Sequence, residues 1–163
     1  MFIRSCAALA AACLSLASGP VVAQSGDAIA IRDAEMRTTG SMARSGAAFM
    51  LIENALPGDD RLVAARSDIA ARVELHTHRE DAAGVMRMIE VEEGFVIPGG
   101  GSRALARGGD HVMFLGLHRA PESGETVSLT LVFENAGEIE LEVPVADLQP
   151  GAASHGHGHG HHH

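Results

Sequence analysis

Three short segments of the chain carry histidine and methionine side chains at alternate positions: His76-Thr77-His78, Met86-Arg87-Met88 and His111-Val112-Met113. Because alternate residues of a β-strand point to the same face, the two members of each pair share a face wherever the segment is a strand. Imidazole nitrogen and thioether sulfur without a thiolate form a soft ligand set that suits Cu(I) better than hard ions. The three pairs therefore indicate a copper site.

The residues that flank the pairs indicate which face they occupy. In the first two segments the apolar residues take the opposite parity from the histidines and methionines: Val73, Leu75, Val85, Ile89 and Val91. A short polar loop, Arg79–Gly84, joins these two segments and predicts a β-hairpin that brings imidazole and thioether together, away from the core. The face of the third pair stays open, because Leu115 and Leu117 share its parity.

Composition excludes several classes of protein. The chain has 163 residues, of which 46% are hydrophobic and 20% charged, and this predicts one globular domain. The formal charge is -9, from 12 basic and 21 acidic side chains, whereas binding to nucleic acid needs a basic face. Every basic side chain is an arginine, so Schiff-base chemistry on lysine is excluded as well.

The remaining pattern is that of an all-β protein. Short alternating runs are separated by Gly, Pro and Asp turns, and they predict eight strands: Ala28–Arg32, Ala47–Glu53, Arg72–His78, Val85–Val91, Gly101–Ala106, His111–Leu117, Thr126–Glu134 and Glu138–Val145. In the last run, three apolar residues alternate with three glutamates, as in an antiparallel sheet with one wet face. About eight strands in one domain favour a Greek key sandwich of two sheets.

The first 23 residues resemble a signal peptide. A basic start at Arg4 precedes an apolar run that is too short to span a bilayer, and small residues precede a cleavage position after Ala23. We therefore expect export to the periplasm, with Cys13 as an acylated residue as the alternative. Cys6 and Cys13 both lie in this segment, so the mature chain lacks the thiolate that a blue-copper electron carrier needs.

The domain is expected to span residues 24–148 and to be followed by a flexible tail over residues 149–163. The tail carries six histidines that could chelate Cu(II), Ni²⁺ or Zn²⁺: His155, His157, His159, His161, His162 and His163. Both a natural extension and a purification tag are compatible with this pattern.

The segments around the three pairs resemble the periplasmic copper chaperone domain known as PCuAC. The resemblance runs from about Ile29 to Val145 and includes Ala47–Asn54, Asp60–Val63, Val73–His76, Gly84–Met88, Ile97–Gly100 and Gly109–Leu117. The metal motif of that family is a His, then a Met, then a His-x-Met, and the resemblance implies the ligands His76, Met88, His111 and Met113. Both intervals are one residue longer here, with 11 and 22 intervening residues, which leaves Met86 and His78 as alternative ligands.

The resemblance implies a cupredoxin-like β-sandwich that binds Cu(I) at an exposed site and is a chaperone rather than an enzyme. It further implies delivery of copper to the copper-site subunits of cytochrome oxidase, alongside a Sco-type protein. Arg87 and Glu90, beside the methionine pair, are candidates for supporting the ligands.

Other functions stay open at this point. The protein could buffer periplasmic copper or confer resistance to it, instead of delivering it. His76, His78 and His111 could form the three-histidine zinc centre of an enzyme, although no catalytic base accompanies them. The domain could also be an interaction module in which copper binding has no role.

Overall fold

A computed structural model describes residues 28–38 and 40–146, and this part of the chain consists of strands and turns without a helix. The ten strands are β1 (Ile29–Thr38), β2 (Ser45–Asn54), β3 (Asp60–Arg66), β4 (Ala70–Glu80), β5 (Met86–Glu90), β6 (Phe95–Ile97), β7 (Ser102–Leu105), β8 (His111–Leu117), β9 (Thr126–Phe133) and β10 (Gly137–Pro144). The described residues therefore include no helix of the length and apolarity that crossing a membrane requires. The predicted signal peptide, both cysteines and the histidine-rich tail lie outside these residues.

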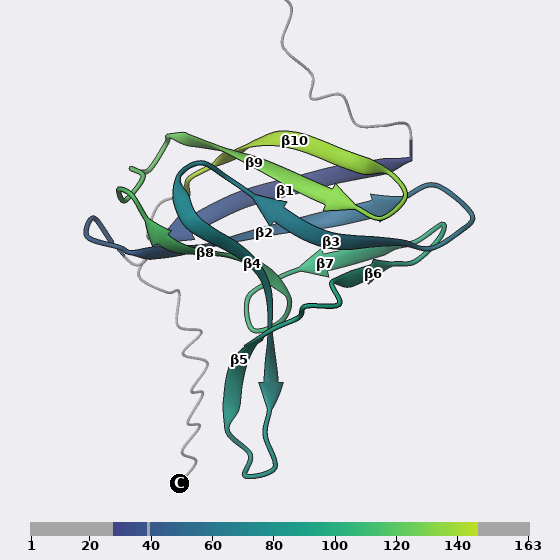
Figure 1. Ribbon diagram of the computed structural model, residues 1–163, viewed down its shortest axis with the longest axis horizontal. Helices are drawn as coiled ribbons and strands as arrows, with labels where there is room; N and C mark the ends of the chain where they lie inside the picture. The colour runs from purple at the N-terminus through teal and green to yellow at the C-terminus, as the bar shows by residue number, and fades with distance from the viewer. Residues whose placement is uncertain (1–27, 39, 147–163) are drawn as a thin grey trace, which may run out of the picture.

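The strands form two antiparallel sheets that pack face to face (Figure 1). The larger sheet has the order β1-β2-β8-β4-β5, with β7 also paired to β2, and the smaller sheet has the order β10-β9-β3-β6. The predicted all-β sandwich is confirmed. In Figure 1 the hairpin formed by β5 and the end of β4 projects beyond the body of the two sheets.

The hydrophobic core lies between the sheets. Its largest fully buried side chains come from both layers and include Met36, Ile52, Val112, Phe114, Leu129, Leu131 and Val143. Burial of such side chains stabilises the fold by roughly 25 cal/mol per Å² of apolar surface. Because the core uses only one face of the larger sheet, the residues of alternate parity lie on its other face, which we call the outer face.

Two strands were missed in the sequence pattern. β3 begins at Asp60, which the pattern assigns to a turn, and its register shifts between Leu62 and Ala64, so its alternation is irregular. β6 has only three residues. β3 and β6 form strands because β3 pairs with β6 and β9, and local sequence does not predict such pairing.

The first strand is longer than predicted. The sequence pattern ends it at Arg32, whereas β1 continues to Thr38 past a register shift between Arg32 and Glu35. Asp33, inside this irregular stretch, has a φ of 51°. Asp tolerates this left-handed conformation better than most residues, which explains how the strand passes the bulge.

A buried carboxylate ties the start of β3 to the turn between β9 and β10. The Asp60 carboxylate accepts hydrogen bonds from the backbone N–H groups of Asn135 and Ala136, both at 2.9 Å, and from that of Arg61 at 2.7 Å. Burial alone would raise the pKa of Asp60, but these hydrogen bonds outweigh it and hold the pKa below its ordinary value. The charged form of Asp60 therefore stabilises the fold.

We expect Asp60→Asn to destabilise the protein by about 1–3 kcal/mol at pH 7, because an amide cannot accept all of these hydrogen bonds. Since the pKa of Asp60 is lowered in the folded state, its contribution is present above the ordinary carboxyl pKa of 3.8 and is lost as the pH falls through the folded-state value. Urea denaturation at several pH values measures this, with exposed Asp68→Asn as the matched control. A deficit that persists unchanged in acid would contradict the assignment.

Candidate metal centre

Three strands that lie side by side in the larger sheet carry the histidine and methionine pairs. In the β4–β8 pairing His76 lies directly opposite His111, and in the β4–β5 pairing His78 lies opposite Met88. Directly opposite residues of antiparallel strands point to the same face of a sheet. These four side chains therefore share the outer face, and the hairpin predicted through Arg79–Gly84 is present.

The pairing of β8 decides the parity that its own sequence left open. Val112 and Phe114 are fully buried in the core, so His111 and Met113 lie on the outer face. Gly116, with a φ of 68°, interrupts the alternation, and Leu117 beyond it is buried. This interruption explains Leu117, whereas Leu115 is half-buried and shares the outer face with His111 and Met113.

Neighbouring rings enclose His111 on the outer face, and it is only 3% exposed. Its ring centroid lies 5.3 Å from that of His78, 5.9 Å from that of His76 and 6.1 Å from that of Phe49. Burial lowers the pKa of His111; the hydrogen bond to Gly109 opposes this, and the other two histidines reinforce it. His111 is therefore neutral at pH 7, the state in which imidazole binds a metal.

The nitrogen of one predicted ligand lies against the sulfur of another. The Nε2 atom of His111 is 3.2 Å from the Sδ atom of Met88, while its Nδ1 atom is 3.0 Å from the carbonyl oxygen of Gly109. Met88 is 44% exposed. Met86 lies opposite Glu80, further along the hairpin, so the sulfur of Met88 is the one that adjoins the imidazole.

His76 is 8% exposed and is held by an acidic neighbour on its own strand. The Nε2 atom of His76 is 2.8 Å from Oε2 of Glu74, and Oε1 of Glu74 is 2.7 Å from a guanidinium nitrogen of Arg72. The Nδ1 atom of His76 is buried and has no hydrogen-bond partner among the described residues. Glu74 was not among the site residues predicted from the sequence, although its parity with His76 on one strand was a signal that could have found it.

The other predicted site residues lie around this group. Met113 is half-buried and lies opposite Glu74 on β4 and Ala47 on β2, which places it on the outer face beside His111. The Nδ1 atom of His78 is 3.5 Å from the Gly109 carbonyl oxygen that His111 contacts. The fold thus brings residues of all three segments to one region of the outer face.

The two candidate supporting residues of the sequence analysis have different positions. Arg87 has the opposite parity from the methionines, and its Nε atom is 2.5 Å from Oδ2 of Asp81 in the hairpin turn. Glu90 lies opposite His76 in the β4–β5 pairing and is exposed. Arg87 therefore braces the hairpin, whereas Glu74 contacts a histidine.

A site made only of nitrogen and oxygen donors does not form here. Within residues 28–38 and 40–146, no group of three or more His, Cys, Asp or Glu side chains is arranged to hold a metal ion. His76, His78 and His111 therefore do not make a three-nitrogen zinc centre in this conformation.

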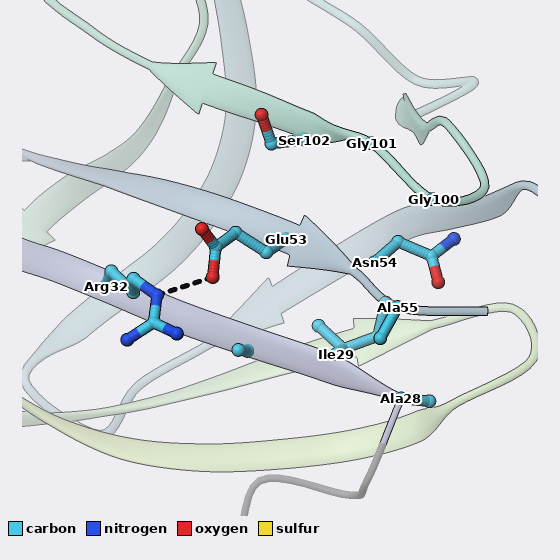
Figure 2. Close-up of a pocket in the computed structure, with 10 residues that line it drawn as sticks. Ala28, Ile29, Arg32, Glu53, Asn54, Ala55, Gly100, Gly101 and Ser102 are labelled. Atoms are coloured by element: carbon cyan, nitrogen blue, oxygen red, sulfur yellow. Dashed lines mark hydrogen bonds and ion pairs between the residues drawn. The ribbon is translucent and has the colours of Figure 1, made fainter.

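A pocket of about 530 Å³ lies elsewhere, where β1 and β2 meet the loop that leads into β7 (Figure 2). Arg32 and Glu53 form an ion pair in it, and Asn54 and Ser102 also line it. None of its lining residues is a histidine or a methionine. The pocket is thus separate from the candidate metal centre.

Comparison with known proteins shows that the chain matches a known family. The model of the LpqE-like family, whose description names lipoproteins, matches residues 29–145. The protein Lxx21020 of Leifsonia xyli subsp. xyli (strain CTCB07), also named as a lipoprotein, is 33% identical over 132 residues, which are 80% of this chain and 77% of that protein.

Solved structures of similar fold include two copper-bound proteins. The copper-bound PCuAC domain from PmoF2 is 25% identical, with a TM-score of 0.60, over 72% of this chain and 92% of that domain. Apo-DR1885 from Deinococcus radiodurans is 28% identical, with a TM-score of 0.58, over 93% of this chain and 99% of that one. Its CuI form is 27% identical, with a TM-score of 0.56, over 76% and 83% of the two chains. The fold expected from the sequence resemblance is confirmed.

Proposed function

This chain belongs to the LpqE-like family, and from that premise we propose that it is an exported copper chaperone that binds Cu(I) on the outer face of its larger sheet. The proposed ligands are His76, Met88, His111 and Met113. Copper is the cargo of the protein, and no catalytic step is part of the proposal.

One contact carries the proposal. Nε2 of His111 and Sδ of Met88 lie 3.2 Å apart, so an imidazole and a thioether present their donor atoms to the same point. Soft, neutral donors of this kind favour a monovalent copper ion over harder cations. The buried Nδ1 of His76, which has no partner within the part of the chain that the structure describes, is proposed as a further nitrogen donor from the neighbouring strand.

The similar structures support copper as the ion. One of them is a copper-bound PCuAC domain and another is the CuI form of DR1885, at 25% and 27% identity to this chain. We propose that the cargo passes to the copper-site subunits of cytochrome oxidase, with a Sco-type protein as a partner. Buffering of copper without delivery, or resistance to it, is the competing role, and a zinc or copper enzyme is a more distant one.

Export is a further part of the proposal. The names of the family and of the relative from Leifsonia xyli both contain the word lipoprotein, which supports a chain that leaves the cytoplasm. We propose a periplasmic location, with cleavage after Ala23 or, in a lipoprotein, acylation at Cys13. The mass of the exported protein distinguishes an N-terminus at Gln24 from a lipid-bearing cysteine.

The histidine-rich tail is proposed to bind Cu(II). Ala146, the last described residue, donates a backbone hydrogen bond of 2.9 Å to Met36 on β1, two strands from β8 in the same sheet. A Cu(II) ion held by His155–His163 would be tethered to the molecule that carries the Cu(I) site, which raises its local concentration there.

The first prediction of this proposal concerns which methionine binds. We expect Met88→Leu to weaken Cu(I) binding by about 10–100-fold, because a leucine of similar volume removes the sulfur that faces His111. Met86→Leu is the matched control on the same face of the same strand, and we expect it to leave the affinity within about twofold. Competition titration against a Cu(I) chelator measures both.

Equal affinities of the two variants and the wild-type chain would refute the proposed site. If only Met86→Leu weakened Cu(I) binding, the sulfur ligand would be Met86 instead of Met88. X-ray absorption of the copper-loaded chain, counting sulfur and nitrogen neighbours, checks the ligand set independently.

The second prediction separates delivery from buffering. We expect the Cu(I)-loaded chain to transfer its copper to the isolated soluble copper-site domain of a cytochrome oxidase, because thioether and imidazole ligands exchange more readily than the thiolates of the acceptor. The optical spectrum of the acceptor reports the transfer. Retention of the metal against this acceptor would favour the buffering role.

The third prediction concerns the tail. Deletion of residues 155–163 should lower the number of Cu(II) ions bound and leave Cu(I) binding unchanged, because the two ions use separate ligands. Isothermal titration with each ion measures the stoichiometry. If the number of Cu(II) ions bound per chain did not change, the role proposed for the tail would be wrong.

A further inference from the structure

The two buried histidines are held by acceptors that have no proton to give. His76 directs Nε2 at a carboxylate oxygen of Glu74, at 2.8 Å, and His111 directs Nδ1 at the carbonyl oxygen of Gly109, at 3.0 Å. Neither oxygen can donate a hydrogen bond in these contacts, so the nitrogen must donate in each case. In the neutral form of each ring, this contact places the single ring proton on a definite atom.

The consequence is that the rings are opposite tautomers. In His76 the proton is on Nε2, so Nδ1 carries the lone pair, and this atom is the buried nitrogen without a partner in residues 28–38 and 40–146. In His111 the proton is on Nδ1, so Nε2 carries the lone pair, and this atom is the one that faces the sulfur of Met88. In each ring the nitrogen with the lone pair is thus the one that does not face an oxygen acceptor.

We propose that Glu74 is the positioning residue of the centre: it fixes the tautomer of His76, so that His76 binds the metal through Nδ1 while His111 binds it through Nε2. The assignment of the metal rests on the proposed function, whereas the tautomers rest on the contacts alone. An acceptor on the far nitrogen of a histidine ligand orients the ring and raises its basicity.

The surroundings of Glu74 suit this role. Arg72, Glu74 and His76 alternate along β4, so the three side chains lie in a row on the outer face. Arg72 occupies one carboxylate oxygen of Glu74 and leaves the other for His76. The Glu74 side chain is 14% exposed, so little water competes for this contact.

The chain offers a matched control for charge. Glu90 lies directly opposite His76 on the other neighbouring strand and has the same net charge as Glu74. It is exposed, whereas the Nε2 atom of His76 is bonded to Glu74. A purely electrostatic effect of an acidic neighbour would act from both positions, whereas a positioning effect acts only from Glu74.

The first test reads the tautomers without metal. Long-range ¹H–¹⁵N correlation of the rings in the full, metal-free chain, assigned with His76→Gln and His111→Gln, should show a protonated Nε2 in His76 and a protonated Nδ1 in His111. Glu74→Ala should convert His76 to a mixture of both forms, and Glu90→Ala should leave it unchanged. The same tautomer in both rings of the wild-type chain would overturn the proposal.

The second test adds Cu(I). We expect the resonances of His76 Nδ1 and His111 Nε2 to move, Glu74→Ala to weaken binding by about 10–100-fold, and Glu74→Gln, whose amide oxygen still accepts, to weaken it less. Glu90→Ala should stay within about twofold of the wild-type affinity. Equal losses from Glu74→Ala and Glu90→Ala, or coordination through Nε2 of His76, would overturn it. If the wild-type chain has the predicted tautomers but no affinity for Cu(I), the proposed function is wrong. The assignment of Glu74 as the residue that fixes the tautomer of His76 would still hold.

Discussion

The antiparallel register between β4 and β8 is the constraint on which the site depends. This register sets His76 opposite His111, although 34 residues lie between them in the chain. A shift of one residue would turn Val112 outward and bury a histidine in the core, because side chains alternate between the faces of a sheet. The fully buried Val112 and Phe114 resist such a shift, so the apolar face of the sheet fixes the geometry of the polar face.

Local sequence could predict those parts of the site that depend on one strand or one hairpin. The parity of the first two pairs and the short loop between them were sufficient to place His78 and Met88 on a common face, and the structure has them directly opposite each other. Local sequence could not predict which strands pair with β8, because that pairing depends on the arrangement of the whole sheet. The proposed choice of Met88 over Met86 likewise rests on the contact with His111, which crosses from one strand of the sheet to another.

The strands that the sequence did not reveal have a physical reason in common. β3 is rich in alanine and starts at Asp60, a residue typical of turns, yet its carboxylate is buried and accepts backbone hydrogen bonds from the β9–β10 turn. The local propensity of Asp disfavours a strand at residue 60, but tertiary contacts override that propensity. Glu74 was missed for the same reason. The sequence shows only an acidic residue on a strand, which is usually solvated, and its contact with the His76 ring is a feature of the folded structure.

The donors of the site differ in burial, and this difference bears on how copper would enter and leave. The imidazoles of His76 and His111 are 8% and 3% exposed and are each tied to a protein acceptor, whereas Met88 is 44% exposed on a projecting hairpin (Figure 1). Buried imidazole rings that are tied through one nitrogen lose little freedom when the other nitrogen binds a metal, so they are preorganised for it. An exposed, unbranched thioether rotates easily and can release the ion to an incoming ligand. Exchange would therefore begin on the sulfur side of the centre, at the hairpin, while the nitrogens still hold the ion.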